Sequence, residues 1–235
     1  MSADMDAGMQ HWRLWQLLDS SFPTGGFAHS GGVEASARAG LLPPGDSQVL
    51  EEHIAAALAS SCSLALPFLL AAHGGSDAAA LSATLDLHLV ASPVARRASA
   101  AAGAALLRAA AGAFPNAAAA PLEQLRVRAA RTHTLLHGAV VLGVLSAALR
   151  LPAATAARAH LFLLLRDACS AATRLGVLGP MAASAMQARC AARAEAMLAE
   201  AMAQDCDVEN AAGGNPFADT LQAGHDALFA RLFQS

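Results

Sequence analysis

Alanine dominates this sequence, and that bias narrows the folds open to the chain more than any single motif does. Alanine loses no side-chain entropy in a helix, so its intrinsic helix propensity is the highest of all amino acids. Residues that favour strands are scarce, because the chain has no tyrosine and only 4% aromatic residues. The composition therefore predicts a protein built from helices.

Glycine, proline and capping residues divide the chain into segments that each suit one helix. The connections are short, and neither a βαβ alternation nor an internal repeat occurs. We therefore expect a single compact all-α bundle over residues 11–235, preceded by a flexible segment at residues 1–10. The expected helices are a short one with Trp12, Trp15 and Leu18 on one side, a short one with Glu34 in its first turn, and longer ones over residues 47–72, 77–91, 93–112, 122–149, 153–175, 180–203 and 217–233.

The charge pattern argues against a nucleic-acid-binding protein. All fifteen basic residues are arginine, the formal net charge is −3, and no arginine cluster is interleaved with aromatic residues. The four cysteines form no CxxC pair, and the first ten residues do not resemble a secretory signal. Reduced thiols in a cytoplasmic protein are the expected state.

Two uncharged stretches, residues 53–76 and 132–149, are long enough to raise the possibility of a membrane protein. Both contain polar serine, threonine or histidine side chains, and neither is flanked by the aromatic residues of an interfacial belt. Buried bundle helices are the better interpretation, and a small membrane protein remains an alternative.

Two motifs could carry chemistry. The glycine-rich segment at residues 23–34 could cradle a phosphate, but a phosphate-binding loop needs a lysine that this chain lacks, so a tight structural turn is favoured. His133 and His137 would share one face of a helix and are weak metal-ligand candidates without a third ligand. A histidine-bearing metal carrier is thus an alternative. No nucleophile or acid–base constellation occurs, so the chain is not expected to be an enzyme.

The C-terminal segment predicts a docking surface. Leu228 and Leu232, and Phe229 and Phe233, would lie four residues apart on a helix and form an apolar stripe. Such a stripe must pack onto the chain's own core or into the groove of a partner. Arg231 could simply compensate the dipole at a helix end.

Four segments in order resemble the UreF family of urease accessory proteins. Residues 14–34, LWQLLDSSFPTGGFAHSGGVE, are similar to its signature LLQLxDSxxPxGxF(A/S)(H/Y)SxGxE, and residues 231–235, RLFQS, are similar to its terminal RLFRS. Residues 137–143, HGAVVLG, resemble H(F/Y)PVVxG, and residues 174–179, RLGVLG, resemble the start of RLxPLGQ. The sequence departs from these patterns at Gly138-Ala139, at Pro180 and at Gln234, which removes a positive charge from the tail.

The resemblance implies an all-helical UreF fold that forms a homodimer and binds no cofactor tightly. It implies a scaffold that recruits the UreG-type GTPase to apo-urease together with a UreD/UreH-type protein, so that these partners handle nickel and GTP. The partner-binding residues it suggests are Phe27, His29, Glu34, Arg231, Leu232, Phe233 and Ser235. The structural motif residues it suggests are Pro23, Gly25, Gly26, Ser30, Gly32, His137, Gly143, Arg174 and Gly179.

Overall fold

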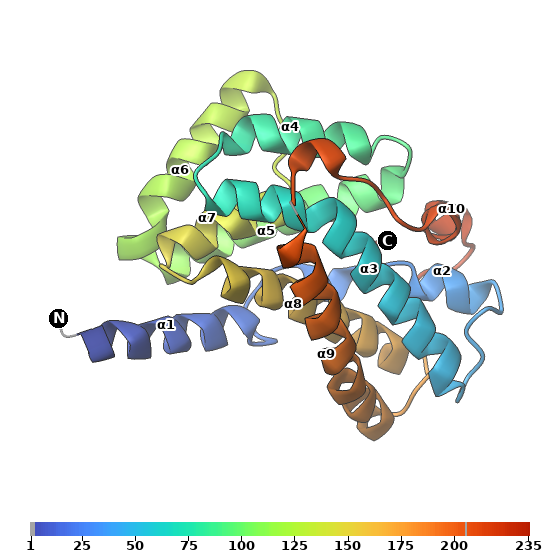
Figure 1. Cartoon of the computed structure of the whole chain (residues 1–235). Coiled ribbons are helices and arrows are strands. Elements are labelled where there is room, and N and C mark those ends of the chain that lie inside the picture. The colour runs from blue at the N-terminus through green and yellow to red at the C-terminus, as the bar shows by residue number, and fades with distance from the viewer. Residues whose placement is uncertain (1–2, 205) are drawn as a thin grey trace.

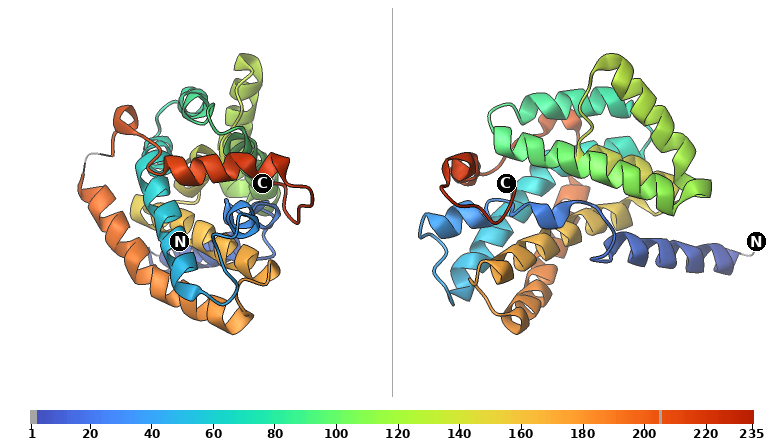
Figure 2. Two further views of the ribbon diagram at one scale, coloured as in Figure 1. Left: turned by 90° about the vertical axis from the view of Figure 1, so that its right-hand side faces the viewer. Right: turned by 180° about the vertical axis from the view of Figure 1, so that it is seen from behind.

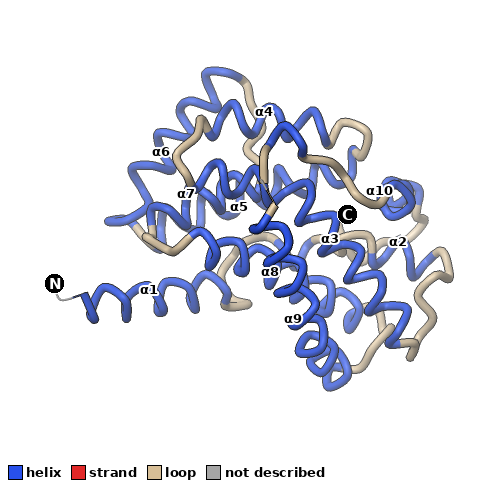
Figure 3. The backbone as a smooth tube through the Cα atoms, viewed as in Figure 1, coloured by secondary structure: helices blue, strands red, loops and turns tan. Residues whose placement is uncertain are grey.

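The computed structural model describes residues 3–204 and 206–235, and every regular element within them is a helix (Figures 1 and 3). The prediction of an all-α fold is therefore confirmed. The α-helices are α1 (Ala3–Leu18), α2 (Val33–Arg38), α3 (Ser47–His73), α4 (Ala78–His88), α5 (Pro93–Ala113), α6 (Pro115–Thr132), α7 (Gly138–Ala148), α8 (Ala153–Arg174), α9 (Pro180–Ala203) and α10 (Pro216–Ala223), with 3-10 helices η1 (Gly26–Ala28), η2 (Val208–Asn210) and η3 (Gly224–Ala227).

Helix α3 is the central element of the bundle and packs against α7, α8 and α9 (Figure 1). Its first turn is fixed by Asp46, whose carboxylate accepts hydrogen bonds from two backbone N–H groups at 3.1 and 3.2 Å. Leu50, Ile54 and Leu58 repeat every four residues along one face and are fully buried. Among the described residues α3 alone has the length and apolar composition to cross a membrane, and half of that stretch is buried inside the protein.

The single helix expected over residues 122–149 is wrong, because α6 and α7 are separated by a loop. His133 ends α6 with a φ of 53°, a left-handed conformation that stops the helix. The backbone N–H of His137 donates to the Ser82 hydroxyl at 2.9 Å, which ties the loop to α4. The second apolar stretch considered as a membrane span is therefore a loop followed by the short helix α7.

The closing helix expected over residues 217–233 is also shorter than predicted. Helix α10 ends at Ala223, η3 adds one turn, and residues 228–235 are not helical, with bends at 229–230 and 232–233. The i, i+4 contacts expected for Leu228 with Leu232 and for Phe229 with Phe233 are therefore absent from the described tail.

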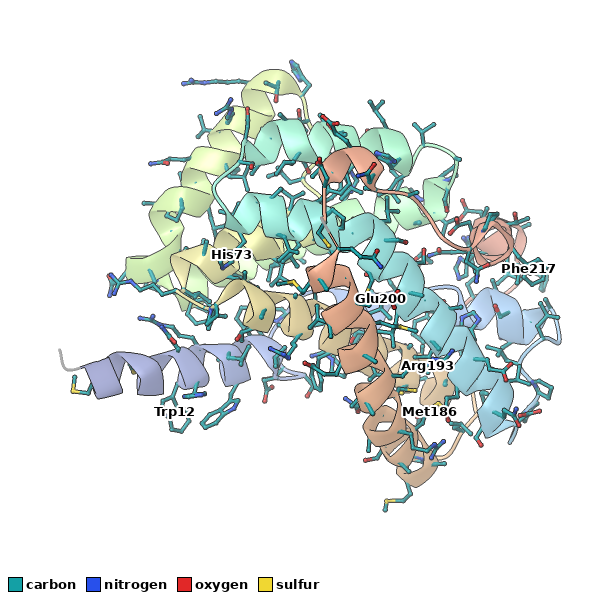
Figure 4. The ribbon with its side chains drawn as sticks, viewed as in Figure 1. Trp12, His73, Met186, Arg193, Glu200 and Phe217 are labelled. Atoms are coloured by element: carbon teal, nitrogen blue, oxygen red, sulfur yellow. The ribbon has the colours of Figure 1, made fainter. Side chains whose placement is uncertain are left out.

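Helix α1 projects from the body of the protein as an arm (Figures 1 and 2). It begins at Ala3, inside the segment expected to be flexible, while Met1 and Ser2 lie outside the described residues. Leu17 in its last turn is fully buried, so the arm is anchored at its C-terminal end. Trp12 and Trp15 are 65% and 57% exposed and lie edge to face, with Trp12 pointing away from the body (Figure 4).

Candidate functional site

The two ends of the sequence meet at one place, which we call the terminal junction: loop residues 24–34 and tail residues 225–235. Their backbones pair over a short stretch, and the C-terminus lies close to α2 (Figures 1 and 2). The N–H of Gln234 donates to the Ala28 carbonyl at 2.8 Å, and the N–H of Ser30 donates to the Ser235 carbonyl at 2.7 Å. The end of the tail is thus held by backbone pairing that a helical tail could not make.

Glu34, in the first turn of α2, anchors the tail through its carboxylate. One carboxylate oxygen accepts the N–H of Leu232 at 2.8 Å, and the other accepts the N–H of Phe233 at 3.1 Å and lies 3.0 Å from His225 Nε2. Both the Glu34 and His225 side chains are fully buried. Burial alone would raise the pKa of Glu34, but the hydrogen bonds from Leu232, His225 and Phe233 together lower it. The carboxylate is therefore ionised, and both of its oxygens have hydrogen-bond partners.

Polar side chains on the loop fix the end of the tail. The Ser30 hydroxyl donates to the Ser235 carbonyl at 2.9 Å, and His29 Nδ1 lies 2.7 Å from the Ser235 hydroxyl. Burial and the nearby His225 lower the pKa of His29, so its ring is neutral near pH 7. The turn itself depends on Gly25 and Gly32, whose φ angles of 79° and 89° favour residues without a Cβ.

Arg174, in the last turn of α8, joins the loop to the tail. Its guanidinium donates to the Phe27 carbonyl at 2.7 Å, and its guanidinium carbon lies 4.3 Å from the centroid of the Phe233 ring. An arginine can do both because its planar group donates along its edge and stacks on its face.

The junction leaves apolar and basic groups exposed around its rim. Phe229 is fully exposed, Leu232 is 54% exposed, and Phe217 on the neighbouring helix α10 is 66% exposed (Figure 4). Arg231 is also exposed and forms a long ion pair of 3.5 Å with Asp226. Exposed aromatic and arginine side chains are the types that most often dominate binding energy at protein interfaces.

A cavity of about 410 Å³ lies beside the junction, between α3, α5, α7, α8 and α10. Its walls are mainly apolar, with a few polar groups that include His53, His160 and Asp167. His160 Nε2 lies 2.8 Å from the Ser61 hydroxyl, and burial lowers the pKa of His160 to about 4. The ring is therefore neutral at physiological pH.

Comparison with known proteins shows which family the chain belongs to. The sequence model of the UreF family matches residues 45–191. Urease accessory protein F of Oryza sativa subsp. indica is 38% identical over 226 residues, covering 94% of this chain and 84% of the relative. The chain belongs to the UreF family. Urease accessory protein F of Arabidopsis thaliana is also 38% identical, over 95% of this chain and 92% of its own length. Urease accessory protein UreF of Paenarthrobacter aurescens (strain TC1) is 33% identical, over 94% of this chain and 96% of its own length.

Three of the seven partner-binding residues suggested by the UreF signature lie inside the protein. Glu34 is 0% exposed, Ser235 is 2% exposed and Phe233 is 6% exposed. Each is occupied by contacts within the junction, and its contact with a partner stays a prediction. Their observed role is to hold the tail in place.

The other four suggested residues differ in exposure. Arg231 and Leu232 are exposed on the tail and are free to contact a partner. Phe27 and His29 are half-buried. The guanidinium carbon of Arg166 lies 4.7 Å from the Phe27 ring centroid, so this ring has intramolecular contacts as well as an exposed part.

The two weak metal-ligand candidates do not form a pair on one helix face. His133 is the C-terminal cap of α6, whereas His137 precedes α7 and is fully buried. His137 Nε2 lies 3.1 Å from Asp86, which also binds Arg96. In the part of the chain that the structure describes, no group of three or more metal-ligating side chains could hold an ion.

The remaining UreF motif residues have structural surroundings. Pro23 lies on the exposed turn that leads into the loop. A Cβ on Gly143 would lie 2.3 Å from the Leu69 carbonyl oxygen, so glycine lets α7 pack closely on α3. Gly179 caps α9 with an ordinary φ of −74° and open space around it, so the structure gives no reason for glycine there.

Sequence reasoning missed three residues that organise these sites: His225, Asp86 and Arg166. His225 partners a carboxylate 191 residues away, and Asp86 partners a histidine 51 residues away. No local spacing indicates such pairs. The signal that could have raised interest in His225 is its position close to the terminal motif.

Proposed function

We propose that this chain is a non-catalytic scaffold for urease maturation. In this role it recruits a UreG-type GTPase, together with a UreD/UreH-type protein, to apo-urease. Nickel and GTP are handled by those partners, and the chain itself binds no cofactor tightly. The relatives are named as urease accessory proteins, and this accessory role of the family supports the proposal.

The observation that carries the proposal is the terminal junction. The two segments that most resemble the UreF pattern lie at opposite ends of the sequence, yet they meet and are locked together by Glu34. Residues inside the junction are buried, whereas Phe229, Arg231 and Leu232 remain exposed on its rim. An anchored segment that presents an aromatic, an aliphatic and a basic side chain has the composition of a protein-binding hot spot.

The same contacts argue against a nucleotide site in the glycine-rich loop. A phosphate cradle needs free backbone N–H groups, but the N–H of Ser30 is bonded to the Ser235 carbonyl and that of His29 to the Gly26 carbonyl. The chain also lacks the lysine of a phosphate-binding loop. Any nucleotide chemistry in the assembly therefore belongs to a partner.

A binding assay with the purified cognate GTPase and UreD/UreH-type protein tests this function. We expect Leu232→Ala and Arg231→Ala each to weaken capture of the GTPase by ~2 kcal/mol, the scale of an interface hot spot. Leu87→Ala is the matched control, because Leu87 is 73% exposed on α4, away from the junction. If both tail variants bind as the parent does, the tail is not the GTPase-binding surface.

The proposal includes a homodimer in the cytoplasm. Large apolar side chains are exposed at several places, including Trp12 on α1 and Phe162 on α8. Such groups are commonly covered by association. Light scattering at micromolar concentration measures the oligomeric state, and a monomer would contradict this part of the proposal.

A further inference from the structure

A second polar cluster lies next to the terminal junction, around Arg166 on α8. The Arg166 side chain is only 11% exposed. It donates to the carbonyl of Leu18, the last residue of α1, at 2.9 Å, and twice to one oxygen of Asp167, at 2.9 and 2.7 Å. Its guanidinium carbon lies 4.7 Å above the centroid of the Phe27 ring. One side chain thus contacts the α1 arm and the loop of the junction at once.

The loop also rests directly on the partner of Arg166. A Cβ placed on Gly26 would lie 1.9 Å from an oxygen of Asp167, so any larger residue would require this carboxylate or the loop to move. Burial raises the pKa of Asp167, while the charge and hydrogen bonds of Arg166 oppose that rise. The arginine therefore holds the carboxylate in place as well as the Phe27 ring and the end of α1.

The contacts of Arg166 depend on the shape of its group and not only on its charge. A guanidinium donates in several fixed directions in its plane and stacks on an aromatic ring with its face. A lysine ammonium could keep the attraction to Asp167, but it could not also reach the Leu18 carbonyl and cover Phe27.

We propose that Arg166 is a positioning residue that fixes the α1 arm and Phe27 in one arrangement, so that a partner meets the arm and the junction as a single preformed surface. Preformed surfaces bind more tightly because less conformational freedom is lost on binding. The inference rests on the proposed function for its consequence in binding. The arrangement itself can be tested in the isolated chain.

The first measurement uses the two tryptophans of the chain, which both lie on α1. Their fluorescence anisotropy decay therefore reports on the arm alone. We expect Arg166→Met and Arg166→Lys each to add a fast component of motion, with the far-UV circular dichroism of the parent. Arg126→Met is the matched control, because Arg126 makes a similar two-bond contact with Glu123 on α6. Parent-like anisotropy in both Arg166 variants would overturn the proposal.

The second measurement is a double-mutant cycle for capture of the GTPase. We expect Arg166→Lys to weaken capture about tenfold, which corresponds to about 1.4 kcal/mol. The loss of affinity in the double variant with Phe27→Ala should be smaller than the product of the two single losses, because part of the effect of Arg166 passes through that ring. A double-variant loss of affinity equal to the product of the two single losses would overturn the proposal. If Arg166→Met does not fold, Arg166→Lys carries both measurements. If the parent fails to capture the GTPase, the proposed function fails while the anisotropy still decides the role of Arg166.

Discussion

His225 lies 3.0 Å from Glu34 at the terminal junction, and His137 lies 3.1 Å from Asp86 in the body of the bundle. Both rings are fully buried, and neither Nδ1 atom has a hydrogen-bond partner within the described residues. The same pair of chemical groups therefore occurs in two regions of the molecule. The two pairs differ in what else the carboxylate binds.

At the junction, the remaining partners of Glu34 are backbone N–H groups of the tail. In the body, Asp86 binds Arg96 through two short contacts of 2.6 and 2.7 Å and is 20% exposed. A carboxylate that binds backbone N–H groups fixes the path of a chain segment, whereas one that binds an arginine joins helices that are already formed. The first pair therefore fixes the path of the tail, and the second links α4 to α5 and to the residue that precedes α7.

The largest effect is expected from Glu34→Ala. The substitution leaves His225 and two tail N–H groups buried without their acceptor, so we expect a loss of about 3 kcal/mol, the scale for breaking a buried pair. Hydrogen exchange at the amides of Leu232 and Phe233 should accelerate first, because the tail is released before the bundle unfolds. Glu195→Ala is the control, since its ion pair with Arg158 is exposed and should contribute below ~1 kcal/mol. If the tail amides stay protected from exchange in Glu34→Ala, the Glu34 carboxylate does not hold the tail in place.

A smaller and differently located effect is expected from Asp86→Asn. The charge-assisted contact with Arg96 is lost while most of the shape is kept, so urea unfolding should show a loss of about 1.5 kcal/mol. Exchange at the tail amides should match the parent, because Asp86 does not contact the junction. Faster exchange of the tail in this variant would mean that the two anchors are coupled rather than separate.

The smallest expected effect is a difference between His137 and Glu34 in the pH range over which each loses its contribution to stability. Burial lowers the pKa of His137, partly opposed by its hydrogen bond to Asp86, so the folded state disfavours the protonated ring. The stability it contributes is fully present above the ordinary value of 6.5 and is lost as the pH falls below that value. Glu34 has a lowered pKa, so its contribution is lost only as the pH falls below its ordinary value of 4.5.

The His137→Gln variant tests this difference. Between pH 7.5 and 5, its unfolding free energy should fall less steeply than that of the parent, because one titrating ring is missing. His160→Gln serves as a reference in the same window, since the pKa of His160 is lowered to about 4 by burial without a carboxylate partner. Parallel pH profiles for parent and His137→Gln would show that the His137 ring does not contribute to acid sensitivity.

Local chemistry predicted the helices where the ends are marked by capping residues or proline. Helix α9 spans Pro180–Ala203, as expected from the break at Gly179 and Pro180, and α3 begins at Ser47 after its Asp46 cap. Prediction failed where a distant group competes for the backbone. The loop before α7 is held by Ser82, and the tail is held by Glu34, so neither continues as a helix.

The terminal junction was also predicted only in part, because contacts with distant residues decide which of its side chains are exposed. The resemblance to the UreF pattern directed attention to both ends of the chain, and Arg231 and Leu232 are indeed exposed there. The resemblance could not separate exposed residues from residues that hold the tail, because both kinds occur in one short motif. Phe233 and Leu232 are neighbours in sequence, yet one is covered by Arg174 and the other lies in solvent.

The amino-acid sequence predicts that the chain is helical, where most of its helices begin and end, and which family it resembles. These properties follow from side-chain entropy, caps and the order of short motifs, all of which are local in the chain. The tertiary structure alone shows that the tail is not helical, that Glu34 anchors it, and that Arg166 joins the α1 arm to the loop of the junction. Each of these depends on bringing together groups more than a hundred residues apart, where burial makes a hydrogen bond to a charged group strong enough to override local helix propensity.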